Sequence, residues 1–365
     1  MWQRSDGLLA AGTCRPGGRD LRSSRISKPY RRRLRVALSQ FAGWLIHSCR
    51  PPLEEVLNSA VQAASCLADY GNFLYAQSPV RHSDFKHAIL AVQTVRREFR
   101  GLLTEAWDTL GSWHMKIPFG MRVPMVRELL WAMFAQALTF GFVLNTSQAG
   151  GWLCSAVAFL TGYHAMLRPG ELGALRRADI ELPDLEGPGD PVVVLSVKSP
   201  KNFRAMGRIQ TAVIRDMVTI RWLIWLCRDV PRSSLLFPGG LPKIKKFFYR
   251  LLTFMELVDL GLTVGSLRAG RATDLFIQGI EITRLRVMGR WKNITTLDHY
   301  VQEASSYRVS FQLADDTRAR VRELLALARP FRVPPRDPWQ RYFERRAEFG
   351  PRGLFGGGDG GAKGK

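Results

Sequence analysis

Residue types that can act on a phosphate group occur in three short motifs in the second half of the chain. Arg168 lies in the sequence MLRPGEL, Arg268 lies in SLRAG, and Trp291 ends the sequence GRW, with Tyr300 nine residues beyond it. Guanidinium groups bind phosphate oxygens through paired hydrogen bonds, and a tyrosine hydroxyl can form a covalent intermediate. These four residues are therefore the first candidates for chemistry.

Each candidate also has a simpler structural explanation when it is taken alone. Arg168 can pair with Glu171 one helical turn further on. Ser266 can cap a helix that ends near Gly279, Trp291 can be a core residue, and Tyr300 can fill a gap with its hydroxyl hydrogen-bonded. The chemistry depends on whether these motifs come together.

The elements that would position these residues are mostly helices. Helical patterns cover residues 36–115, 125–168 and 217–328. Between the two arginines, the β-branched runs Val192–Val197 and Ile209–Ile214 predict a hairpin whose loop, Lys198–Arg208, is basic.

Taken together, the motifs resemble those of the tyrosine recombinases, also called phage-type integrases, over about residues 125–305. Arg168, with Glu171 following, matches the first arginine box of that family, Leu-Arg-x-x-Glu-Leu. Arg268 matches the arginine of its His-x-x-Arg box. Trp291 takes the position of its third box, where the family has His or Trp, and Tyr300 takes the position of the nucleophile.

The resemblance also implies a proton donor on the hairpin. The family's hairpin lysine falls on Lys201 or Lys198, and Lys201 is better placed because it follows Pro200 at the turn. A lysine there would protonate the departing 5′-oxygen as a general acid.

The sequence departs from the family pattern at Gly265, where the His-x-x-Arg box has its histidine. Glycine can neither take a proton nor orient a phosphate, so Gly265 puts full catalytic activity in question. His299, beside Tyr300, is a conceivable substitute. A DNA-binding protein that has lost some or all of the chemistry is therefore an alternative, and a type IB topoisomerase-like relaxer is another.

The resemblance implies a mainly α fold with a small antiparallel β-hairpin or sheet in the catalytic domain, and a two-domain clamp around DNA. It implies a site-specific recombinase or integrase that cleaves and rejoins double-stranded DNA through a covalent 3′-phosphotyrosyl link, as a homo-tetramer on DNA. No cofactor, metal or ATP is expected, because religation uses the energy of the phosphotyrosine bond. The GRW sequence and the basic tail suggest a mobile element.

The expected domain organisation has six parts. A disordered basic arm covers residues 1–35, and a helical core-binding (SAM-like) domain covers 36–115. A linker covers 116–124, the catalytic domain 125–310, a C-terminal helix 311–329 and a disordered Pro/Gly-rich tail 330–365. The C-terminal helix is expected to pack either within its own chain or on a neighbouring subunit.

The charge balance agrees with a polyanionic partner. The 365-residue chain has 53 Lys and Arg against 31 Asp and Glu, a net charge of +22. Neither apolar stretch, Leu129–Leu144 or Trp152–Leu160, reaches the roughly 20 residues of a spanning helix. We therefore expect no membrane partner, although a peripheral membrane protein with a basic face is a further alternative. Five dispersed cysteines predict reduced thiols in an intracellular protein. The resemblance implies a DNA-associated protein, which would be nuclear if the source is eukaryotic.

Cations outside the motifs are candidate phosphate contacts, which give affinity without sequence reading. They are Lys86, Arg96, Arg97, Arg100, Lys198, Arg204, Arg208, Lys243, Lys245 and Lys246.

Overall fold

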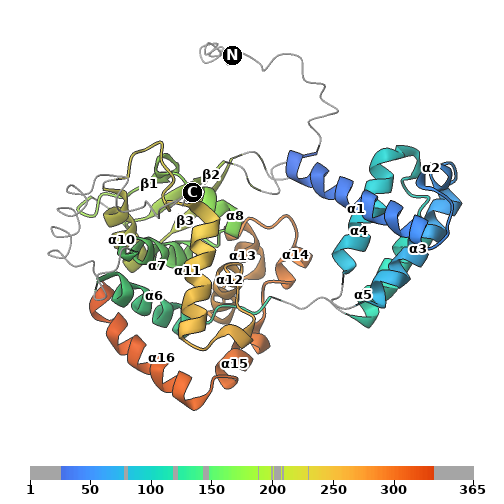
Figure 1. Ribbon diagram of the computed structural model, residues 1–365. Coiled ribbons are helices and arrows are strands. Elements are labelled where there is room, and N and C mark those ends of the chain that lie inside the picture. Colours follow the sequence, from blue (N-terminus) through green and yellow to red (C-terminus); the bar gives the residue numbers. More distant parts are fainter. Residues whose placement is uncertain are drawn as a thin grey trace, which may run out of the picture. The chain divides into compact units, whose positions relative to one another are not determined.

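The computed structural model describes residues 26–332, except 78–80, 118–121, 143–147, 188, 199, 201–206, 208 and 229. The chain divides into two compact units, Met1–Gly120 and Met121–Lys365. Figure 1 shows a small helical unit and a larger unit that carries a sheet. The fold is mainly α with one small antiparallel sheet, as the sequence predicts. The expected arm over residues 1–25 and the tail over 333–365 lie outside the described residues.

The first unit consists of helices around one apolar core. They are α1 (Lys28–His47), α2 (Leu53–Val56), α3 (Ala60–Tyr75), α4 (His82–Val95), the short 3-10 helix η2 (Arg97–Phe99) and α5 (Thr104–Lys116). Helix α1 packs on α4, and α3 packs on α5. Fully buried Phe41, Leu67, Phe85 and Ile89 join these helices in the core.

The basic arm predicted over residues 1–35 is too long by one helical segment. Helix α1 already begins at Lys28, with Ser27 as its N-cap accepting from the Tyr30 backbone N–H at 3.4 Å and Pro29 in its first turn. Leu34 and Phe41 lie buried on one stripe that crosses the predicted boundary. The apolar stripe therefore orders the residues that the basic run suggested would be disordered.

The helical pattern over residues 36–115 is interrupted at two points in this unit. Helix α3 restarts at Ala60, because the Ser59 hydroxyl caps it by accepting from the Gln62 N–H at 3.4 Å. Helix α4 ends at Val95, and the following Arg96 donates through Nε to the Leu57 carbonyl at 2.8 Å. A stripe of apolar residues does not reveal such breaks, because the 3-10 turn η2 still buries Phe99.

The second unit is built around the buried helix α7 (Ala149–His164), every residue of which from Gly150 to Tyr163 is buried. It packs against α6 (Arg127–Phe142), α8 (Pro169–Ala174), α10 (Met217–Cys227), α11 (Gly240–Phe254) and α12 (Ser266–Ile277). The apolar stretches of the sequence are thus core helices. Among the described residues, no helix is long and apolar enough to cross a membrane.

The sheet lies between α8 and α10 in the sequence. Its strands β1 (Ile180–Glu181), β2 (Val193–Val197) and β3 (Gln210–Ile214) are antiparallel in the order β1-β2-β3. Val193 pairs with Ile214, so β2 and β3 form the predicted hairpin. Strand β1, with only two residues, was not predicted because it is too short to show an alternating pattern.

The C-terminal elements pack on the same unit. Helix α15 (Glu303–Phe311) is followed by α16 (Asp315–Ala328), and α16 lies along α6 with Val321 and Leu324 buried (Figure 1). The expected helix 311–329 is therefore shorter than predicted, and in this structure it packs within its own chain. The 3-10 turn η5 (Pro330–Arg332) is also ordered, since the Trp222 indole donates to the Phe331 carbonyl at 2.9 Å.

Candidate active site

Arg168 is placed by the turn between α7 and α8. It is the N-cap of α8, and the Glu171 side chain accepts from its backbone N–H at 3.0 Å and from its Nη1 at 2.6 Å. Helix α8 is held on α11 by Gly173, where a β-carbon would overlap the backbone of Leu241. The structural pairing with Glu171 and a chemical role for Arg168 are thus compatible, because Arg168 remains partly exposed.

Arg268 joins the first and third motifs. It lies in α12, its side chain is fully buried, and its two terminal nitrogens donate to backbone carbonyls. Nη1 donates to the Met166 carbonyl and Nη2 to the Gly289 carbonyl, each at 2.5 Å. One guanidinium therefore connects the chain just before Arg168 to the chain just before Trp291.

Arg290 is a member of this cluster that the sequence analysis missed. Its Nη2 donates to Glu171 Oε2 at 3.0 Å and to the Met166 carbonyl at 3.2 Å. Arg290 has φ +59° and Met166 has φ +47°, values that non-glycine residues adopt at a cost in energy. The side chain of Arg290 thus turns inward from a strained turn, which a motif read as a string of letters cannot show.

Trp291 and Tyr300 cover the Arg268 guanidinium. The Cζ of Arg268 lies 4.2 Å from the centre of the Trp291 ring and 5.4 Å from that of the Tyr300 ring. The two rings meet edge to face with centroids 5.1 Å apart. Helix α13 (Ile282–Met288) ends just before Trp291, and α14 (Ile294–Asp298) carries the chain from Trp291 to Tyr300. Arg168, Arg268, Trp291 and Tyr300 thus belong to one continuous set of contacts.

The backbone of Tyr300 is pinned to α12 by Thr273, which the sequence analysis also missed. The buried Thr273 hydroxyl donates to the Tyr300 carbonyl at 3.1 Å and accepts from the Gln302 N–H at 3.0 Å. Helix α12 therefore fixes the positions of both Arg268 and Tyr300, although only Arg268 stands in a recognisable motif on this helix.

The cluster carries an excess of positive charge. Arg168, Arg268 and Arg290 surround a single carboxylate, Glu171, which leaves a net charge of +2. Burial and the neighbouring Arg168 and Arg290 lower the pKa of Arg268 to about 9, so its guanidinium is charged at neutral pH. Burial alone would raise the pKa of Glu171, but Arg290 and Arg168 lower it.

Two donors in the cluster have no hydrogen-bond partner among the described residues. They are the buried Nε of Arg268 and the buried Nε1 of Trp291, whose side chains lie against each other. Buried donors are normally satisfied, so unpaired ones beside a surplus of positive charge are the pattern of an anion-binding site.

The hairpin lysines are only partly described. Lys198 forms an ion pair with buried Asp179, which precedes β1, so its ammonium group is held at the edge of the sheet. Lys201, Arg204 and Arg208 lie outside the described residues. His299, the conceivable substitute for the missing histidine, is exposed.

The other candidate DNA contacts lie at the surface of their own units. Lys86, Arg97 and Arg100 are exposed in the first unit, whereas Arg96 is partly buried and bonded to the Leu57 carbonyl. Because α4 ends at Val95, Lys86 lies in α4 whereas Arg97 and Arg100 lie beyond its end. In the second unit Lys245 and Lys246 are exposed on α11, and Lys243 is half-buried.

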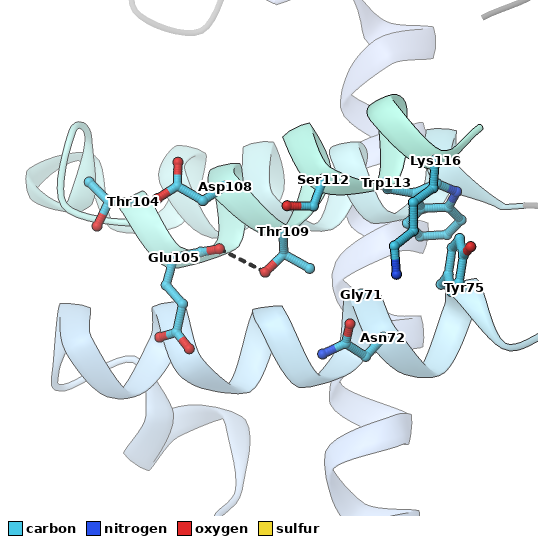
Figure 2. A pocket seen from close by; sticks show the side chains of 10 residues that line it. All are labelled: Gly71, Asn72, Tyr75, Thr104, Glu105, Asp108, Thr109, Ser112, Trp113 and Lys116. Carbon is cyan, nitrogen blue, oxygen red and sulfur yellow. Dashed lines mark hydrogen bonds between the residues drawn. The ribbon is translucent and has the colours of Figure 1, made fainter. Parts of the chain in front are cut away.

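A separate groove of about 440 Å³ lies in the first unit between α3 and α5. Figure 2 shows its polar lining, with Glu105, Asp108 and Lys116 on α5 and Asn72 on α3. None of the motif residues lines it. No group of three or more potential metal ligands occurs among the described residues.

No family model matches the sequence, and neither does any curated protein. The solved structures to which the chain is similar include a XerA recombinase, at 17% identity and a TM-score of 0.37, covering 84% of this chain and 94% of that one. A XerH site-specific recombinase bound to palindromic difH substrate has 13% identity and a TM-score of 0.44, covering 69% and 71%. The Tn1549 transposon integrase, in complex with circular intermediate DNA, has 11% identity and a TM-score of 0.45, covering 76% and 99%. All three are recombinases or integrases.

Proposed function

We propose that the chain is a tyrosine recombinase that cleaves and rejoins double-stranded DNA. The observation that carries this proposal is the contact of Arg268 with both Trp291 and Tyr300, in a cluster that also holds Arg168 through Glu171 and Arg290. A permanently charged clamp beside a phenol is what attack on an anionic phosphodiester requires.

In the proposed reaction, the Tyr300 oxygen forms a bond to phosphorus as the bond between phosphorus and the 5′-oxygen breaks. The phenol releases its proton to solvent water, and the departing 5′-oxygen gains one from a general acid. The product is a 3′-phosphotyrosyl link with a free 5′-hydroxyl, and attack by the 5′-hydroxyl of another strand reverses the step. The number of phosphodiester bonds is conserved, so the reaction requires no ATP.

The residues of the cluster would divide the work. Arg168 and Arg268 would hold the non-bridging oxygens, and Trp291 would donate its indole N–H to the same phosphate. Glu171 would keep Arg168 and Arg290 in place through its ion pairs with both. It would not act as the base, since a carboxylate bonded to two arginines is a poor base. Lys201 is the better general acid, since the ammonium group of Lys198 is engaged by Asp179.

A nicked-duplex trapping experiment tests the proposal. DNA duplexes with a randomised centre and a nick in one strand lose a short fragment after cleavage, which prevents religation and traps the covalent adduct. We expect an adduct with the unaltered chain and none with Tyr300→Phe. Replacing Arg168 or Arg268 by Ala should slow its formation by about 10²–10³-fold. Tyr307→Phe, at an exposed tyrosine on α15, is the matched control and should form the adduct normally.

The same experiment separates the alternatives. DNA binding without any adduct would indicate a DNA-binding protein that has lost the chemistry, for which Gly265 is the specific observation. An adduct together with relaxation of supercoiled plasmid, but without joining of separate duplexes, would indicate a type IB topoisomerase-like activity. Joined duplexes support the recombinase, and an assembly of four copies on DNA would support the tetramer.

A further inference from the structure

The space beside Gly265 is filled by an arginine side chain from elsewhere in the unit. A β-carbon at Gly265 would stand 2.5 Å from Nη1 and 3.3 Å from Cζ of Arg122. The guanidinium of Arg122 thus occupies the space into which a side chain at position 265 would extend. Arg122 comes from the segment that precedes α6, far away in the sequence.

The same guanidinium faces the proposed nucleophile. The Cζ of Arg122 lies 5.8 Å from the centre of the Tyr300 ring, and that of Arg268 lies 5.4 Å from the same ring. Arg122 is exposed, so its donors are accessible to a ligand. Tyr300 is therefore flanked by two guanidinium groups from different elements.

The backbone that carries Arg122 is fixed on α12. The Met125 N–H donates to the Ser266 carbonyl at 3.0 Å. At Gly270, a β-carbon would stand 2.8 Å from the carbonyl carbon and 2.9 Å from the nitrogen of Met125. Two glycines thus allow this segment to approach α12. Gly270 makes room for the Met125 backbone, and Gly265 makes room for the Arg122 side chain.

From this geometry we propose that Arg122 is a further catalytic residue, which contacts the scissile phosphate in place of a side chain at position 265. The proposal rests on the function proposed above. Arg122 would supply a permanent positive charge and several N–H donors to a non-bridging oxygen. An arginine does not exchange protons near neutral pH, so the replacement restores anion binding without restoring proton transfer.

Exchange of the two side chains tests the assignment on the nicked duplexes. Arg122→Ala should slow adduct formation by about 10²-fold or more, whereas Arg127→Ala, at an exposed arginine five residues on, should not change it. In Arg122→Ala/Gly265→His, the imidazole can enter the vacated space and should recover part of the lost rate. The double variant should also gain a dependence on pH near the ordinary histidine pKa of about 6.5 that the unaltered chain lacks.

A measurement without DNA keeps the two proposals separable. Inorganic sulfate, at constant ionic strength, should raise the unfolding temperature of the unaltered chain and of Arg127→Ala, and should raise that of Arg122→Ala less. Equal adduct rates and equal sulfate shifts in Arg122→Ala and the unaltered chain would overturn the role of Arg122 while leaving the recombinase standing. No adduct from the unaltered chain, with a sulfate shift that depends on Arg122, would instead keep the anion contact and overturn the DNA cleavage.

Discussion

The indole of Trp291 lies directly against the α-carbon of Gly289, so that a β-carbon at position 289 would overlap the six-membered ring. The same tryptophan contacts Arg268 and Tyr300. Gly289 therefore decides where Trp291 sits, and through it the position of two proposed catalytic groups. The glycine of the GRW sequence is explained by this close approach and not by its backbone angles, since its φ of −84° suits any residue.

We expect Gly289→Ala to displace Trp291. Because the ring is buried on all sides, the extra methyl should lower the free energy of unfolding by about 1–3 kcal/mol and also abolish adduct formation. Thermal unfolding and the nicked-duplex assay measure the two effects. Gly170→Ala, where a β-carbon meets nothing within 4 Å, is the matched control. Unchanged adduct formation in Gly289→Ala would contradict the supporting role of Trp291.

Glu171→Gln should destabilise the second unit strongly. It removes the carboxylate that lies against buried Arg290 and leaves that guanidinium uncompensated, a loss of about 3–5 kcal/mol. Arg290 and Arg168 hold the pKa of Glu171 below its ordinary value in the folded chain. Its contribution is therefore complete above the unfolded pKa near 4.3 and is lost as the pH falls below it. Urea unfolding between pH 3 and 7 should show that the free energy of unfolding falls at acid pH, and falls less in Glu171→Gln. The same fall in both proteins would contradict the stabilising role of the Glu171 carboxylate.

Thr273→Val should impair both the chemistry and the fold. Valine has nearly the same shape but loses both hydrogen bonds to the backbone at Tyr300 and Gln302, a cost of about 1–3 kcal/mol. The misplaced tyrosine should slow adduct formation by more than tenfold. Thr273→Ser retains the hydroxyl and should restore the rate, and the comparison of the two variants at matched stability is the test. If serine and valine behave alike, the hydroxyl does not position the tyrosine.

Acid should also destabilise the chain through His164, at the end of α7. Burial lowers its pKa to about 4, and Arg271 and Arg127 act in the same direction, whereas Asp216 and Asp274 oppose them. The unfolded chain protonates His164 near pH 6.5, before the folded chain does. Stability is therefore fully present above about pH 6.5 and falls towards pH 4, by about 3 kcal/mol from this group. His164→Gln should flatten that part of the stability profile, which chemical unfolding at a series of pH values records.

The parts of the fold that repeat over many residues were accessible from the sequence. The apolar patterns predicted the core helices α6 and α7, and the β-branched runs predicted the β2–β3 hairpin. Features that depend on one or two residues were not. Examples are the break after Val95, the two-residue strand β1 and the early start of α1. Each depends on local hydrogen bonds or caps, which a pattern of apolar residues does not reveal.

In the candidate site, too, the sequence predicted some residues and missed others. Arg168, Arg268, Trp291 and Tyr300 stand in recognisable motifs, and the structure brings them together. Arg290 was missed because a positive φ turns its side chain inward, although it is the middle letter of GRW. Arg122 was missed because nothing in the sequence relates it to Gly265; the two meet only when the segment before α6 lies on α12.

The surplus of positive charge in the cluster makes folding and ligand binding thermodynamically linked. Guanidinium groups held together with one carboxylate repel one another, and the folded state carries that repulsion whenever no anion is bound. An anion that binds only the folded chain stabilises it by RT ln(1 + [L]/Kd), about 2.7 kcal/mol at one hundred times Kd. The melting temperature of this protein should thus serve as a sensor for phosphate-bearing ligands, even before any DNA target sequence has been found.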